Sequence, residues 1–110
     1  GYELTAESFG DFYASSLLNR NIEELTVNGS DATIYWRPIG GSNIIETLFY
    51  YEKSDNSIGE ISVSPAEMST TLSDVKIEGK YWYKTLFKPV QNAIDVFESE
   101  THKDVFPIPQ

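Results

Sequence analysis

Short segments in which apolar residues alternate with polar ones recur along the chain from residue 22 onward, bounded by turn-forming residues. A period of two places the apolar side chains on one face of an extended strand. Several such segments at close spacing predict an all-β sandwich, and the Asn28-Gly29 pair suits a tight turn that needs a positive φ. Seven strands are expected, within residues 21–29, 31–38, 44–53, 60–65, 69–75, 80–87 and 94–101.

The size and charge of the chain limit what it can be. Its 110 residues, 40% of them hydrophobic, suffice for one compact core. Acidic residues number 17 against 8 basic ones, which gives a formal charge of −9. Because this charge repels phosphate backbones and anionic lipids, we expect no nucleic-acid partner. The apolar runs are far shorter than the roughly 20 residues of a membrane span, so we also expect no insertion into a membrane.

Residues 1–20 have a different pattern, and we assign them to a connector or to the tail of a preceding module, with the sandwich at 21–110. The spacing of Phe9, Phe12, Tyr13, Leu17 and Leu18 favours a short amphipathic helix over about residues 11–18, or an irregular packed connector. The first residue is Gly rather than Met, which is typical of an excised fragment or of a residue left by a tag.

A dense aromatic run follows a predicted crossing between the two sheets. Leu72 enters this crossing, and Val75 and Ile77 are expected to line it. A buried Tyr whose hydroxyl reaches back to the backbone stabilises a corner of this kind, and Tyr81 lies at the right place. The expected structural residues are Trp36, Leu72, Tyr81 and Tyr83.

This combination resembles a fibronectin type III domain, whose second strand carries a buried Trp and whose sixth strand opens with the corner Tyr. The resemblance implies an immunoglobulin-like, seven-stranded antiparallel sandwich. Ile77 stands where fibronectin repeats usually have Pro in the crossing, so the turn geometry is expected to differ.

Two longer motifs extend the resemblance. "FGDFYASSLLNRNI" and "YKTLFKPVQNAIDVFESE" are similar to the opening "YGDxYxxSLLNRPI" and the closing "YRTLYLPEPNAIDTFYT" of the second of two fibronectin-like modules in an uncharacterised family of exported Bacteroidetes surface proteins. Asn21 replaces the usual Pro, and "KPVQNAID" replaces "LPEPNAID". These departures affect loop stiffness and leave the expected fold intact.

The resemblance implies a non-catalytic structural or spacer module of a secreted protein or lipoprotein. Such modules commonly accompany domains suspected of binding glycans, and no activity attaches to the module itself. We therefore expect an extracytoplasmic location at the cell surface, neighbouring domains of the same polypeptide as partners, no enzymatic activity and no cofactor.

Few residues offer chemistry of their own. His102 is the only histidine and is expected to be solvated, so neither a His metal cluster nor a Ser-His-Asp constellation is expected. The absence of cysteine excludes a disulfide or thiolate site. Asp55, Asn56 and Glu60 carry oxygen ligands, but a hairpin turn is favoured over a calcium loop. A carboxylate pair for glycoside hydrolysis cannot be selected among the acids, and solvation is the favoured role for them.

The alternative function is carbohydrate binding through outward-facing aromatic rings, with a glycan as partner. If the corner tyrosines face the core, Trp82 faces outward, and the same alternation places further rings outside. The candidate ligand-binding residues are Trp82, Tyr35, Phe49 and Tyr51. We favour the other interpretation, in which the connector covers these rings, because soluble monomers rarely expose large apolar patches.

Overall fold

The computed structural model of the protein describes residues 19–38, 44–88 and 94–110. Within these residues the chain is built from eight β-strands, and none of the described residues is helical. The strands are β1 (Ile22–Asn28), β2 (Asp31–Trp36), β3 (Ile44–Glu52), β4 (Ile58–Val63), β5 (Ser69–Leu72), β6 (Lys80–Phe87), β7 (Phe97–Glu98) and β8 (His102–Val105).

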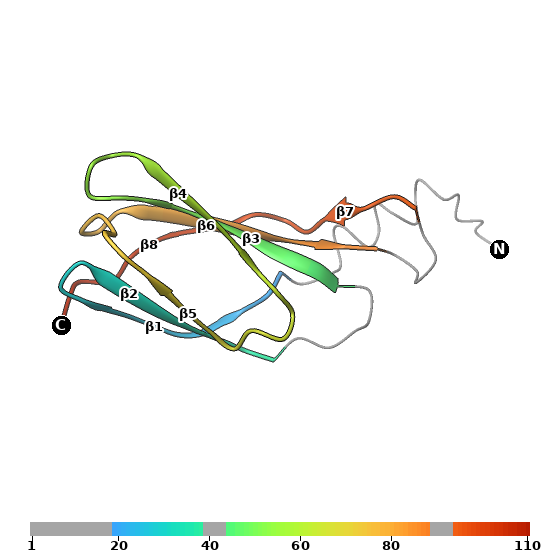
Figure 1. Ribbon diagram of the computed structural model, residues 1–110, viewed down its shortest axis with the longest axis horizontal. Helices are drawn as coiled ribbons and strands as arrows, with labels where there is room; N and C mark the ends of the chain where they lie inside the picture. The colour runs from blue at the N-terminus through green and yellow to red at the C-terminus, as the bar shows by residue number, and fades with distance from the viewer. Residues whose placement is uncertain (1–18, 39–43, 89–93) are drawn as a thin grey trace.

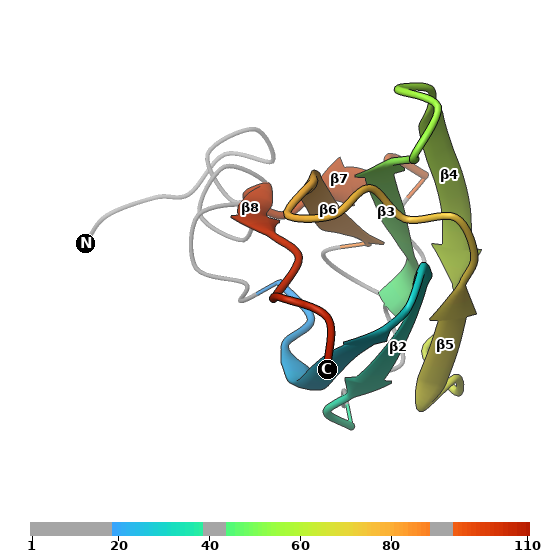
Figure 2. The same cartoon turned by 90° about the vertical axis from the view of Figure 1, so that its left-hand side faces the viewer.

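The strands form two antiparallel sheets that face each other (Figures 1 and 2). The first has three strands in the order β1-β2-β5, and the second has five, in the order β4-β3-β6-β7, with β8 also paired to β6. The expected all-β sandwich is therefore confirmed. Among the described residues, no helix has the length and apolar character needed to span a membrane.

The edge beside β6 holds two short strands where the sequence predicted one at residues 94–101. Both pair with β6, and the register shifts by one residue between them, which marks a bulge. At the bulge, the Thr85 backbone N–H donates to Ser99 Oγ at 2.8 Å, and the Ser99 N–H returns a bond to the Thr85 carbonyl at 2.9 Å. Val96, where we expected the strand to settle, is exposed and precedes β7.

Two tight turns follow the turn chemistry of the sequence. Gly29 joins β1 to β2 with φ of 66°, and Asn56 lies between β3 and β4 with φ of 68°. The Asp55 carboxylate accepts a hydrogen bond from the Ser57 N–H at 2.9 Å, and hydrogen bonds from Ser57 lower the pKa of that carboxyl. The hairpin interpretation of residues 54–60 is confirmed.

Aromatic side chains from both sheets fill the core. Trp36 on β2 lies edge-on to Phe49 and to Tyr83, with ring centroids 6.0 and 5.4 Å apart, which is a favourable aromatic geometry. Phe49 in turn stacks on Tyr81 at 5.4 Å. The predicted structural residues are all buried: Trp36, Leu72, Tyr81 and Tyr83.

The side chains of β3 that face the core are shifted by one residue from the prediction. Phe49 and Tyr51, expected outside, are 0% and 7% exposed and belong to the core, whereas Leu48 and Tyr50 face outward. The strand is apolar and aromatic on both faces, so alternation alone does not identify the buried one. Thr47 shares the inner face with Phe49 and forms a hydroxyl hydrogen bond with Thr85 at 3.1 Å.

The crossing from β5 to β6 is closed mainly by backbone hydrogen bonds. Val75 is buried and its N–H donates to the Ser30 carbonyl at 2.9 Å, while the Lys76 N–H donates to Glu52 at 3.1 Å. Ile77, expected to line the crossing, is 66% exposed. Main-chain carbonyls therefore satisfy these two N–H groups of the corner.

The residues just before β1 are packed into the sandwich. The predicted helix at 11–18 lies outside the described residues, but Asn19 and Arg20, the last residues of the expected connector, are described. Asn19 Nδ2 donates to the Tyr83 carbonyl at 2.6 Å and to the Glu100 carbonyl at 3.1 Å, so it joins β6 to the segment between β7 and β8. Its Oδ1 accepts from Thr85 Oγ1 at 2.7 Å.

Arg20 is 2% exposed, although it carries a charge. Its Nη1 donates to the Ser64 carbonyl at 2.8 Å, Nη2 donates to the Glu67 carbonyl, and the guanidinium lies 5.3 Å from the Trp36 ring centroid. Burial lowers the pKa of the Arg20 guanidinium, and the nearby Glu67 charge opposes that effect. These bonds connect Arg20 to the loop between β4 and β5.

At the other terminus, residues 106–110 cross from the five-stranded sheet toward the three-stranded one. Phe106 is buried against Tyr81, with ring centroids 5.1 Å apart, and its N–H donates to the Gly79 carbonyl at 2.8 Å. The Gln110 N–H donates to the Val27 carbonyl on β1 at 2.9 Å. Figure 2 shows this red segment descending from β8 toward the hairpin of β1 and β2.

Candidate functional site

The structure separates the four predicted ligand-binding residues. Trp82 on β6 and Tyr35 on β2 belong to different sheets and lie on the outer faces. Tyr35 is 46% exposed and Trp82 is half-buried. Because Phe49 and Tyr51 are in the core, no patch combining all four rings exists.

The ring beside Trp82 is Tyr50, which lies on the outer face of β3, where Phe49 and Tyr51 were expected. Tyr50 and Trp82 are cross-strand partners on β3 and β6, and their rings stack with centroids 5.7 Å apart and planes 15° from parallel. Both side chains are half-buried. Only the strand register could have identified this pair, since the two residues are far apart in sequence. The two stacked rings lie on the outside of the five-stranded sheet, and we call them the Tyr50–Trp82 platform.

The register also sets the neighbours of this platform. Lys103 on β8 is the partner of Trp82, and Glu60 on β4 is the partner of Tyr50. One row away, Lys80 is paired with Val105. Two lysines therefore flank Trp82 on the outer face.

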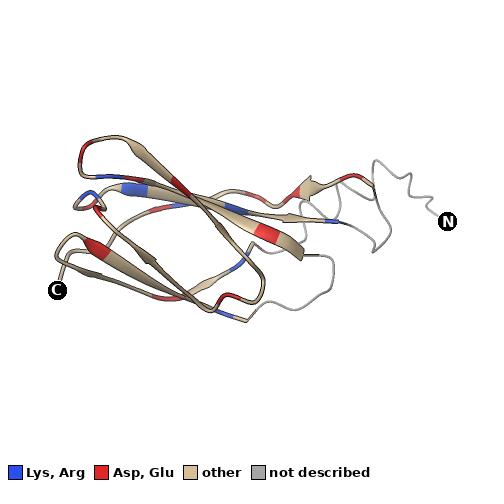
Figure 3. Ribbon diagram, viewed as in Figure 1, with Lys and Arg blue, Asp and Glu red and all other residues tan. Residues whose placement is uncertain are grey.

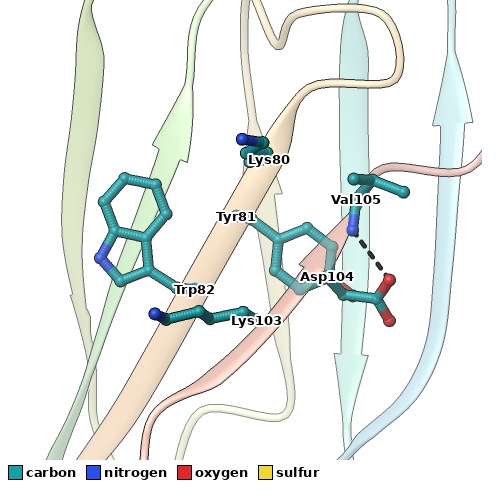
Figure 4. A pocket seen from close by; sticks show the side chains of 6 residues that line it. All are labelled: Lys80, Tyr81, Trp82, Lys103, Asp104 and Val105. Atoms are coloured by element: carbon teal, nitrogen blue, oxygen red, sulfur yellow. Dashed lines mark hydrogen bonds between the residues drawn. The ribbon is translucent and has the colours of Figure 1, made fainter.

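A shallow groove of about 540 Å³ lies at this place, lined by Lys80, Tyr81, Trp82, Lys103, Asp104 and Val105. In Figure 4 the Lys103 side chain extends toward the Trp82 indole, whereas the Asp104 carboxylate points away from it. That carboxylate accepts the Val105 N–H at 2.8 Å and lies 3.8 Å from the His102 ring nitrogen.

Lysines recur along β6 and its end, at Lys80, Lys84 and Lys88, in a chain whose formal charge is −9 (Figure 3). Lys84 forms an ion pair with Glu98 at 2.9 Å. The Nζ atoms of Lys80 and Lys103 have no hydrogen-bond or ion-pair partner within the described parts of the chain. Two ammonium groups beside Trp82 are thus available to a ligand.

The buried tyrosines behind the platform do not supply acid–base chemistry near neutral pH. Burial raises the pKa of Tyr83 to about 12 and also raises the pKa of Tyr81, and the nearby Asp104 charge adds to both effects. The His102 ring lies 5.0 Å from the Tyr83 ring, on the exposed strand β8. Residues 19–38, 44–88 and 94–110 contain no cluster of three or more metal-ligating side chains. The side chains around Trp82 can therefore bind a ligand through stacking on the indole ring and through the positive charges of the two lysines.

Comparison with known proteins identifies the architecture. A family model for a domain of unknown function, DUF4998, matches residues 2–97. No curated protein matches the sequence. The solution structure of the fibronectin type III domain of the human collagen alpha-1(XX) chain is similar, with a TM-score of 0.56, 17% identity and coverage of 84% of this chain and 85% of that one.

A crystal structure of a fibronectin type III domain of human collagen XX is also similar. Its TM-score is 0.50 at 17% identity, with 81% of this chain and 92% of that chain covered. At this identity the likeness establishes the fold alone. The expectation of a fibronectin type III-like sandwich is confirmed.

Proposed function

This chain belongs to the DUF4998 family of domains of unknown function, and from that premise we propose that it is a non-catalytic structural module. Its role is to hold neighbouring domains of a longer polypeptide at a fixed separation and orientation. The observation that supports this proposal is that a buried side chain anchors the fold near each described end, Arg20 at one and Phe106 at the other.

The two anchors attach to different ends of the sandwich. Arg20 donates to the loop between β4 and β5. Phe106 donates its N–H to Gly79, just before β6, and Gln110 in the same tail donates to Val27, beside the turn between β1 and β2. In Figure 1 that loop lies toward the right and the C-terminus lies at the left. A rigid domain that is fixed at opposite ends keeps the relative orientation of its two neighbouring domains constant, whereas a flexible linker does not.

Distances between the ends test this role. The chain has no cysteine, so Asn21→Cys and Ile108→Cys provide two dye positions for single-molecule energy transfer. We expect a narrow distance distribution that broadens in Arg20→Ala and is unchanged in the control Arg37→Ala. A broad distribution in the chain without further substitution would contradict the spacer proposal, and turnover of a glycoside by the purified chain would contradict its non-catalytic nature.

The proposed setting is a cell-surface or secreted bacterial protein, and it rests on the two long motifs that resemble exported modules. Proteolytic shaving of intact cells that express the full protein tests the location. Release of peptides from this domain without lysis supports it, and complete protection of the domain in intact cells argues against it.

The Tyr50–Trp82 platform favours a second function, carbohydrate binding. Sugar rings stack on flat aromatic faces, and this pair presents two nearly parallel rings on the outer sheet. Trp82→Ala is expected to remove saturable saccharide binding while the far-ultraviolet circular dichroism spectrum is retained. Tyr35→Ala, which removes an exposed ring from the other sheet, is the matched control and is expected to bind normally.

A further inference from the structure

Within the described residues, the ammonium groups of Lys80 and Lys103 beside Trp82 have no hydrogen-bond or ion-pair partner, in contrast to that of Lys84 on the same face. Lys84, next along the outer face of β6, is neutralised by Glu98 at 2.9 Å. Lys80 and Lys103 lie diagonally across the ladder from one another on either side of Trp82, about 7 Å apart by the usual spacing of diagonal neighbours. Long lysine side chains can close that distance on one anionic group.

The acidic residues near the platform do not occupy these ammonium groups. Glu52, on the same outer face, accepts the backbone N–H of Lys80 at 2.6 Å. Glu60 lies beyond Tyr50, on the side away from Lys103. Asp104 points away from Trp82 and accepts the Val105 N–H (Figure 4).

We propose that the Tyr50–Trp82 platform binds an anionic saccharide, whose ring stacks on Trp82 and whose carboxylate or sulfate contacts Lys80 and Lys103. The inference rests on the second proposed function, carbohydrate binding, and names its ligand class. The formal charge of −9 repels a long polyanion at a distance, but salt screens charges beyond about 8 Å at physiological ionic strength. The preference for an anionic saccharide therefore arises from direct contacts with the two lysines at the groove.

Calorimetric titration of the whole chain with three trisaccharides tests the proposal at one ionic strength. The probes are a galacturonic acid trisaccharide, a sulfated galactose trisaccharide and the neutral galactose trisaccharide. At least one anionic probe is expected to bind more tightly than the neutral one, by about fivefold or more. The anionic probe that binds more tightly shows whether the site recognises a carboxylate or a sulfate.

Charge-removing variants with an internal control complete the test. Lys103→Gln and Lys80→Gln are each expected to weaken binding of the preferred probe by about threefold to tenfold, the range of a partly exposed charge contact. Lys53→Gln removes the same charge outside the groove and is expected to leave binding unchanged. Circular dichroism verifies that each variant is folded.

The outcomes separate this inference from the function on which it rests. If the neutral and anionic probes bind equally and Lys103→Gln has no effect, the anionic preference is wrong while carbohydrate binding stands. If none of the three probes binds, both are overturned for these sugars. If Lys53→Gln weakens binding as much as Lys103→Gln does, general charge explains the effect and the assignment to the groove is wrong.

Discussion

Replacing Arg20 by Ala should lower the free energy of unfolding by about 3 kcal/mol. The substitution leaves the carbonyls of Ser64 and Glu67 without their donors, at about 1 kcal/mol each because both residues are exposed enough for water to reach them. Loss of the contact with the Trp36 ring removes about 1 kcal/mol more. The buried stem contributes about 2 kcal/mol, and removal of the desolvation penalty of the buried guanidinium offsets part of the sum.

Urea unfolding measures this loss directly. Trp36 lies beside the substituted side chain, so its fluorescence reports the transition once Trp82→Phe has removed the other tryptophan. A loss of about 3 kcal/mol corresponds to a fall in melting temperature of roughly 12 °C or more for a domain of this size. Arg20→Lys keeps the charge but loses the planar fork that reaches both carbonyls, and is expected to recover about half of the loss.

The matched control is Arg37→Ala, which removes an exposed arginine at the end of β2 and should cost less than about 0.5 kcal/mol. If Arg20→Ala costs less than about 1 kcal/mol, or no more than Arg37→Ala, the side chain is not an anchor. The proposal that it fixes the orientation of the preceding chain would then be refuted as well.

Three further predictions concern the core. Stability should fall between about pH 10 and 12, because burial raises the pKa of Tyr83 to about 12 and also raises that of Tyr81, so the unfolded state releases its protons first. The fall is at most about 1.4 kcal/mol per pH unit for each tyrosine, and urea unfolding at pH 9 and 11 measures it. Phe106→Ala should cost about 3 to 5 kcal/mol by thermal melting, because this ring is 1% exposed. Gly59→Ala should cost about 2 kcal/mol in the same assay, because the new Cβ would lie 2.4 Å from the ring of buried Tyr51.

Each of these predictions has a comparison that can contradict it. The pH effect should vanish in the double variant Tyr81→Phe and Tyr83→Phe, and persistence there would assign it to other groups. Ile108→Ala, on an exposed side chain of the same tail, should be nearly neutral beside Phe106→Ala. Gly29→Ala places a Cβ in open space at a positive φ, so it should cost only about 1 kcal/mol of backbone strain. A larger loss of stability in Gly29→Ala than in Gly59→Ala would contradict the predicted clash with Tyr51.

Local patterns predicted the sandwich because they mark strands and turns independently of one another. Trp36 and Ile34 alternate cleanly with exposed Tyr35, so β2 could be assigned to one face from sequence alone. Gly29 and Asn56 supply the positive φ that their hairpins need. The corner residues Leu72 and Tyr81 were correctly placed in the core for the same reason.

Features that depend on packing between distant segments could not be predicted in this way. The facing of β3 was wrong because Phe49 and Tyr50 are equally suited to either face, and only pairing with β6 decides between them. That one error removed Tyr50 from the candidate site and placed Phe49 in it. Arg20 was missed because a lone arginine before a strand is normally solvated, and its carbonyl partners lie more than 40 positions later.

The bond between Asn19 and Glu100 joins residues 81 positions apart, and the ring of Phe106 fills the core from the end of the chain. During synthesis from the N-terminus, neither contact can form until nearly the whole domain has left the ribosome. Until then the sandwich cannot close completely, and closing so long a loop makes folding slow. The edge strand that completes the fold is also the last to be made, so the interval before its arrival is when chaperones or proteases have access to the chain.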